Sequence, residues 1–358
     1  MDRLVDQLTD YAMGLSYEDL PGDVLTRAKK LTLDSIGCSF GAYDSPPAEI
    51  ARRICSSVSC PKPAMVLGGG QETTPDLAAF ANGIMIRYLD YSDVYWSTGV
   101  CHPSDMLGPV LAVADSLRVD GKSTILGTVL GYEILCCLVD SEAVRDRRGW
   151  DQAVYGGIAA AVVASKLLQL SAIQMKHAVS LAASSHLTVG QVRSGEISHW
   201  KGCSVANASR NAVFSALLAA EGMTGPDQVF EGRTGVFNAT GGRFELLPLG
   251  GEQNLYRMMS VRVKPYPSGY PSHTAIEAAL KVRTQIPEID QIEKINIRAA
   301  KGGMGYASDA SRWSPETRES ADHSLPFTVA LALLEGSVEI RHFKDEYFKL
   351  PIVRKLMG

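Results

Sequence analysis

Residues 264–273 divide the chain into two parts of different character. Their sequence, KPYPSGYPSH, contains three prolines and a glycine. A helix cannot run through this segment, because proline lacks a backbone N–H and forces the residue before it into an extended conformation. Together with the length of 358 residues, this break predicts two domains. We assign the first to residues 1–263 and the second to residues 264–358.

The part before the break is a succession of helical patterns. Apolar residues recur at helical spacing, and strand-like alternation is scarce. Turn signals such as Gly222 followed by Pro226 end several of the patterns. We therefore predict a large all-helical domain, which makes the fold mainly α. The predicted helices cover residues 2–15, 23–40, 45–57, 74–88, 106–118, 123–139, 153–170, 172–185 and 204–221.

The part after the break mixes two patterns. One helix is predicted over 274–285, with a capping box that begins at Thr274, and another over 323–335. Between them, isoleucines alternate with polar neighbours, which predicts a strand over 292–299. The second domain is therefore expected to be a smaller α+β domain.

Composition excludes several classes of protein. The net charge of −4 gives no reason to expect nucleic acid or an anionic membrane as a partner. The apolar stretches 123–139 and 153–170 are too short or too polar to span a bilayer, and we expect them to be buried helices. The seven cysteines include no C-x-x-C pair and no zinc or iron–sulfur spacing. Reduced thiols, and acidic first residues unlike a signal peptide, predict a cytoplasmic protein.

Three basic side chains stand directly before predicted helix starts. They are His102, Lys201 and His273. The first backbone N–H groups of a helix and the positive end of its dipole attract carboxylates. If the three helix starts converge, they form a pocket for a di- or tricarboxylate, for which this acidic protein must gather positive charge locally. The alternative for Lys201 is a solvated lysine in a loop.

A dense polar stretch runs from Arg87 to Asp93 and continues to His102. Its carboxylates are candidates for acid or base chemistry beside that histidine. The alternative is structural, with Asp90 and Asp93 capping the following turn or pairing with Arg87. The histidines at positions 177, 186 and 323 are predicted to be packing or surface residues.

Several segments together resemble the MmgE/PrpD family. They are NGIMIRYLDYSD (82–93), HPSD (102–105), KG (201–202) with ANASRN (206–211), GMTGP (222–226), KPYP (264–267) and WSPETRESADHSLP (313–326). The resemblance implies a large helical domain, a smaller α+β lid, a cleft between them and a homodimer. It also implies that neither a metal nor an organic cofactor is needed.

The resemblance also assigns site residues. The catalytic candidates are Asp90, His102, Lys201 and His273. The candidates for substrate binding are Tyr306, from the resemblance, and Arg87 and Arg193 as supporting donors. This set overlaps the three bases found at predicted helix starts.

The implied activity is that of a lyase on a small polycarboxylic acid. The family includes 2-methylcitrate dehydratase, cis-aconitate decarboxylase and iminodisuccinate epimerase. As a dehydratase, the protein would use Asp90 or His102 to remove a proton alpha to a carboxylate and to help expel water, while Lys201 and His273 hold carboxylates. A cis-aconitate decarboxylase-like carboxy-lyase would use the same residues. A non-catalytic carboxylate-binding dimer is a hypothesis of another class.

The chain departs from the family pattern in three places. Val94 stands where relatives commonly have threonine, so one hydrogen bond to the substrate would be missing. Trp150 opens a segment in which some relatives carry a histidine. These two departures leave the identity of the acid open. The sequence stops at Gly358, before family members usually end, so we expect the second domain to lack a returning segment at its C-terminal side.

Overall fold

The computed structural model describes residues 2–143, 149–251, 254–299 and 309–358. The chain forms two compact units, each with its own hydrophobic core. Unit 1 consists of Met1–Tyr88, Ser92–Gly190 and Gly202–Val263. Unit 2 consists of Lys264–Gly358 and of two short segments from earlier in the chain, Leu89–Tyr91 and Gln191–Lys201.

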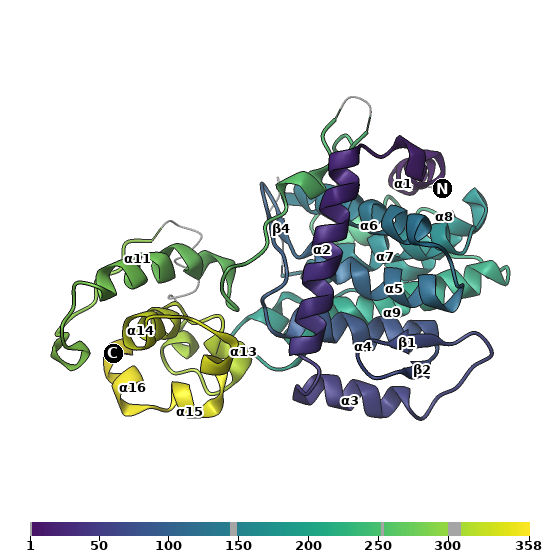
Figure 1. Cartoon of the computed structure of the whole chain (residues 1–358). Helices are drawn as coiled ribbons and strands as arrows, with labels where there is room; N and C mark the ends of the chain where they lie inside the picture. The colour runs from purple at the N-terminus through teal and green to yellow at the C-terminus, as the bar shows by residue number, and fades with distance from the viewer. Residues whose placement is uncertain (1, 144–148, 252–253, 300–308) are drawn as a thin grey trace. The chain divides into compact units, whose positions relative to one another are not determined.

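Unit 1 is built mainly from helices (Figure 1). They are α1 (Arg3–Gly14), α2 (Gly22–Gly41), α3 (Pro46–Cys55), α4 (Pro75–Tyr88), α5 (Leu107–Ser116), α6 (Gly121–Ala143), α7 (Ala153–Leu167), α8 (Ala172–Ser185), α9 (Trp200–Ala220) and α10 (Val236–Thr240). Two antiparallel hairpins accompany them, β1 (Ala64–Val66) with β2 (Gln71–Thr73), and β3 (Tyr95–Trp96) with β4 (Val100–Cys101). The prediction of a mainly α fold is confirmed, although short hairpins interrupt the part expected to be purely helical.

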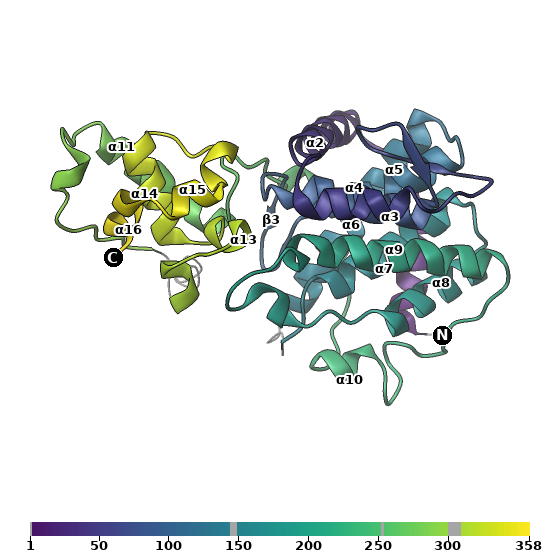
Figure 2. The same cartoon turned by 90° about the horizontal axis from the view of Figure 1, so that it is seen from below.

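The helix α7 forms the centre of unit 1 and lies among α5, α6 and α8 (Figures 1 and 2). All of its residues except Lys166 are buried. Glycines let its neighbours approach closely: a Cβ on Gly156 would lie 2.7 Å from a methyl carbon of Val205 in α9. On α4, a Cβ on Gly83 would lie 2.9 Å from the Cβ of Ala206. This close packing fixes the axis of α9, in whose first turn Lys201 stands.

One helix of the described chain is long and apolar enough to cross a membrane. This is α6 over Gly121–Glu142, and 78% of its apolar window is buried inside the protein. It also carries the buried carboxylate of Glu133, which accepts hydrogen bonds from the backbone N–H groups of Gly250 and Arg257 at 2.9 and 2.7 Å. These contacts are those of a core helix, as expected for this stretch.

Unit 2 is organised around one apolar helix. Its helices are α11 (His273–Arg283), α13 (Arg318–Ala321), α14 (Leu325–Glu335), α15 (Asp345–Phe348) and α16 (Pro351–Met357). The helix α14 packs against α11 and α16 and is buried along most of its length. The hydroxyl of Ser324 accepts a hydrogen bond from the N–H of Phe327 at 3.1 Å and caps the N-terminus of α14. This cap starts α14 directly after Asp322 and His323.

Three local predictions for this part of the chain were wrong. Residues 292–299 are neither helix nor strand, because a strand needs a hydrogen-bonded neighbour and none is found among the described residues. The capping box at Thr274 is not formed, because α11 begins one residue earlier and Glu277 instead accepts from the hydroxyl of Tyr266 at 2.6 Å. The helix predicted from residue 323 begins at Leu325.

Hydrogen bonds hold the two earlier segments within unit 2. The guanidinium of Arg318 donates to the carbonyl oxygen of Leu89 at 3.1 Å. The N–H of Ile197 donates to the hydroxyl of Ser320 at 2.8 Å. Because α13 binds both segments, it brings Asp90 and Lys201 into the same unit as the C-terminal part of the chain.

Candidate active site

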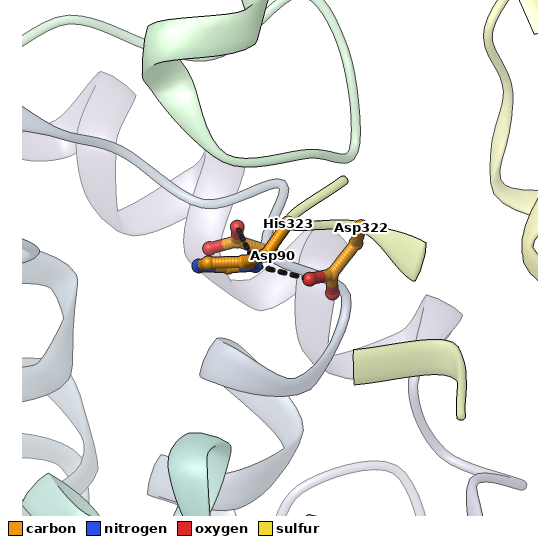
Figure 3. A group of neighbouring side chains, drawn as sticks. All are labelled: Asp90, Asp322 and His323. Carbon is orange, nitrogen blue, oxygen red and sulfur yellow. Dashed lines mark hydrogen bonds and ion pairs between the residues drawn. The ribbon is translucent and has the colours of Figure 1, made fainter. Parts of the chain in front are cut away.

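Unit 2 gathers a buried group of charged side chains, which we call the acid–lysine cluster. Its members are Asp90, Lys201, Lys264, Arg318, Asp322 and His323. Lys264 Nζ donates to Asp90 Oδ1 at 2.8 Å, and Lys201 Nζ lies 3.6 Å from Asp90 Oδ2. Figure 3 shows the side chains of Asp90, Asp322 and His323 pointing toward one another. The side chain of Arg318 is 11% exposed, and the other members are buried.

The backbone at Asp90 has a left-handed conformation, with φ of +49°. A residue with a Cβ disfavours this region, although Asp and Asn tolerate it better than most. Two cations bind the carbonyl groups on either side of the Asp90 α-carbon. Arg318 donates to the carbonyl oxygen of Leu89 at 3.1 Å, and Lys264 donates to that of Asp90 at 2.9 Å. Such a constrained conformation fixes the direction of the Asp90 carboxylate, as is common at functional sites.

Lys201 lies at the centre of the cluster. Its Nζ is 3.4 Å from Asp322 Oδ1 and 3.3 Å from Nδ1 of His323. The residue is the second of α9, not a loop residue before the helix as the sequence indicated. A cation in the first turn is disfavoured by the helix dipole. The nearby carboxylates offset that cost and hold the ammonium in place.

Two buried histidines in unit 2 are uncharged at neutral pH. Burial, helped by the positive charge of Lys201, lowers the pKa of His323 to about 4. Burial, helped by Lys264, lowers the pKa of His273 to about 4 as well. Both rings are therefore uncharged near pH 7, and the role of His273 in holding a carboxylate stays a prediction.

The carboxylates of the cluster lie close to buried cations. Burial raises the pKa of Asp322, but the charge of Lys201 and the hydrogen bond with the ring of His323 outweigh this effect, and the pKa is lowered overall. Within the cluster, the cations Lys201, Lys264 and Arg318 face the carboxylates of Asp90 and Asp322. The buried carboxyl of Glu319 also interacts electrostatically with Arg318 and Asp322. Buried charge is costly unless it is paired, and here the cations and carboxyl groups are held close together.

The two histidines make stability depend on pH. Because their pKa values are lower in the folded protein than the ordinary value of 6.5, the unfolded chain binds more protons between about pH 6.5 and about pH 4. As the pH is lowered through this window, each histidine should therefore reduce the free energy of unfolding by about 1 kcal/mol per pH unit. Urea unfolding at several pH values would measure this slope.

A double variant isolates this effect from other acid-sensitive groups. His273→Gln with His323→Gln should show a shallower slope of the free energy of unfolding against pH. Equal slopes in the double variant and the unchanged protein would contradict the assignment.

The cluster includes a group of possible metal ligands. One oxygen each of Asp90 and Asp322 and a ring nitrogen of His323 lie within 4.8 Å of one another. The ammonium of Lys201 is 3.3 to 3.6 Å from the same side chains. A metal ion among them would face a like charge at close range. The lysine supplies the positive charge at this point, and we assign no metal to it.

His102 lies in unit 1 and follows β4. Its Nδ1 is 2.8 Å from the carbonyl oxygen of Asp93. Because a carbonyl oxygen only accepts, Nδ1 carries the hydrogen, and in the neutral ring Nε2 carries the lone pair. The Asp93 carboxylate accepts from the N–H of Ser104 at 3.0 Å and from the hydroxyl of Tyr132 at 2.7 Å. Asp93 therefore orients the turn that presents His102, which is the structural role considered for it.

The remaining predicted residues lie in unit 1, in unit 2 or outside the described residues. Arg87 is buried in unit 1, with Nε 3.9 Å from Asp105 Oδ1. Arg193 is half-buried in unit 2, and its carbonyl oxygen accepts from Arg312 at 3.2 Å. His273 lies in unit 2, where the electrostatic effects on its pKa include those of Lys264 and Asp90. Tyr306 lies outside the described residues.

Sequence reasoning missed four members of the cluster: Lys264, Arg318, Asp322 and His323. His323 was predicted to be a structural residue that closes the loop ahead of its helix. A signal did exist, since all four lie in the stretches 264–267 and 313–326 that carry the family resemblance. What the sequence does not show is that Asp90 and Lys201 meet these stretches.

Comparisons with known proteins agree with the resemblance. The model of the MmgE/PrpD N-terminal domain matches residues 6–247, and that of the MmgE/PrpD C-terminal domain matches residues 266–358. The chain is similar to 2-methylcitrate dehydratase of Salmonella typhimurium, with 28% identity over 96% of this chain and 74% of the relative. It is also similar to cis-aconitate decarboxylase of Mus musculus, with 26% identity over 96% of this chain and 72% of the relative. Cis-aconitate decarboxylase of Aspergillus terreus is 26% identical over 95% of this chain and 73% of the relative.

Proposed function

Because the chain belongs to the MmgE/PrpD family, we propose that it is a lyase that acts on a small di- or tricarboxylic acid. The observation that carries this proposal is the buried acid–lysine cluster, in which the ammonium groups of Lys264 and Lys201 both contact the carboxylate of Asp90. Relatives named as dehydratase and as decarboxylase support lyase activity in general. Within this class we propose a hydro-lyase similar to 2-methylcitrate dehydratase.

The proposed reaction needs a base, an acid and placed positive charge. A carboxylate of the substrate binds near Lys201 and Lys264. Asp90 or His102 removes the proton alpha to a carboxylate, and the lysines stabilise the charge that develops on that group. The carbon–oxygen bond then breaks, a carbon–carbon double bond forms, and the leaving hydroxide takes up a proton to depart as water. The second of the pair, Asp90 or His102, is the proposed proton donor and must enter this step in its protonated form.

The rival within the family is a carboxy-lyase. There the carbon–carbon bond to a carboxylate breaks, CO2 leaves, and an acid protonates the carbon that remains. The similarity to relatives named as cis-aconitate decarboxylases supports this alternative. We further propose that the protein acts in the cytoplasm as a homodimer, without metal or organic cofactor.

Three substrates distinguish these activities. The purified protein is incubated with 2-methylcitrate, citrate and cis-aconitate, and alkene absorbance and CO2 release are followed together. We expect alkene from 2-methylcitrate without CO2. Release of CO2 from cis-aconitate would instead assign the carboxy-lyase reaction. Tight binding without turnover would favour a non-catalytic carboxylate-binding protein, and absence of both binding and turnover would reject the proposal.

His102 offers a test of the acid–base pair from unit 1. We expect His102→Ala to lower kcat/KM by about 100-fold. In His102→Asn, the side-chain amide can keep the hydrogen bond to the carbonyl of Asp93 but cannot accept a proton, so it should be equally impaired. Steady-state kinetics with the preferred substrate would measure both. Activity restored by asparagine would limit His102 to a structural role.

A further inference from the structure

The loop that leads into α11 and the first residue of that helix contain three buried polar atoms that have no hydrogen-bond partner among the described residues. They are the hydroxyl oxygens of Ser268 and Ser272 and the Nδ1 atom of His273. The two serines are fully buried, and His273 is 6% exposed. Nearly all buried polar atoms in proteins have a partner, because leaving one without it costs free energy. These three atoms lie within six residues of one another in the sequence, and a ligand that forms hydrogen bonds with them would remove this cost.

The hydrogen-bond chemistry of His273 narrows the kind of ligand. Its Nε2 lies 3.2 Å from the carbonyl oxygen of Ser268, which can only accept, so Nε2 carries the hydrogen. The ring is uncharged at neutral pH, because burial and Lys264 lower its pKa to about 4. Nδ1 therefore offers a lone pair and accepts a hydrogen bond. A carboxylate has no hydrogen to donate, whereas an alcohol does.

The two serines complement this acceptor. A serine hydroxyl can both donate and accept. Ser272 precedes α11, yet its side chain makes no capping hydrogen bond. The loop is also tied to the acid–lysine cluster, since the N–H of Gly269 donates to the carbonyl oxygen of Asp322 at 2.8 Å. The cluster supplies positive charge for carboxylates, and the loop supplies uncharged groups for a hydroxyl.

We propose that Ser268, Ser272 and His273 form a subsite for the hydroxyl group of a hydroxylated di- or tricarboxylic acid. This inference rests on the proposed function for the part of the ligand that carries the carboxylates. It assigns His273 to recognition of the hydroxyl and makes a hydroxy acid, not an unsaturated one, the preferred ligand.

A matched pair of acids tests the subsite by binding alone. Citrate and tricarballylate share one carbon skeleton and three carboxylates, and differ in the hydroxyl. Isothermal titration calorimetry should show that citrate binds at least about ten-fold more tightly, because a site built for a hydroxyl rejects the analogue that lacks it. In Ser272→Ala this ratio should approach one, with little change in the affinity for tricarballylate. Thr274→Ala, which alters an exposed side chain two residues after Ser272, should keep the ratio.

A second variant keeps the test valid if Ser272→Ala folds poorly. In His273→Gln the amide can still donate to the carbonyl of Ser268 but the acceptor at Nδ1 is lost, so the ratio should again fall. Equal binding of the two acids to the unchanged protein would overturn the subsite and leave the lyase proposal standing. A ratio that persists in both variants would overturn the choice of residues. Binding of neither acid would overturn both proposals.

Discussion

Replacing Asp90 by asparagine is expected to lower kcat by about 1,000-fold while unit 2 stays folded. Asparagine has nearly the same shape and tolerates the left-handed backbone conformation at this position. It carries no negative charge and cannot take up a proton. Lys264 and Lys201 would then lose the carboxylate that they share.

Steady-state kinetics and thermal unfolding separate chemistry from stability in this experiment. Asp90→Ala should be as inactive as the asparagine variant and, in addition, less stable by about 1 kcal/mol, because alanine disfavours the left-handed region. A kcat close to normal in Asp90→Asn would remove Asp90 from the proton-transfer pair. The base would then have to be sought at His102.

Replacing Lys201 by methionine is expected to lower kcat/KM by about 1,000-fold, the upper range for loss of one charge-stabilising group. Methionine keeps much of the length and apolar character of the lysine stem but removes the ammonium. Asp90 and Asp322 would then lose a cation at 3.6 and 3.4 Å. The pKa of Asp322 should rise, because Lys201 is the leading cause of its lowering.

Two precautions sharpen this measurement. The variant is assayed with and without a chelator, since removal of Lys201 leaves Asp90, Asp322 and His323 open to an adventitious divalent cation. Lys122→Met serves as the matched control, because Lys122 is an exposed lysine that pairs with Glu18 at 3.3 Å. Comparable losses in the two variants would point to a general effect of lost charge. Near-normal turnover in Lys201→Met would exclude the lysine from catalysis.

Local sequence patterns predicted most of the helices of unit 1 to within a few residues. Helical periodicity and turn residues are local properties, and they gave Ala172–Ser185 with both ends correct. They failed for residues 292–299, because a strand depends on a neighbour that no local pattern reveals. Lys201 and His273 were placed before their helices, whereas both lie in the first turn, since helix ends vary by a residue or two.

The candidate site could be predicted only in part, because it is assembled by contacts distant in sequence. The importance of Asp90 and Lys201 was foreseen from charge, spacing and resemblance. The contact between Asp90 and Lys264 spans 174 positions, and no periodicity could reveal it. The role of His323 was missed for the same reason, because the histidine joins the cluster through its contact with Lys201, 122 positions earlier.

The discontinuous make-up of unit 2 has a consequence for engineering and for exchange between relatives. A chimera joined at the boundary of residues 263 and 264 would take Lys264, Asp322 and His323 from one parent. Asp90 and Lys201 would come from the other, because they reach unit 2 from earlier in the chain. The two parents would therefore have to match in charge and geometry across the junction, and transplanted residues 264–358 alone would carry an incomplete set of reactive groups.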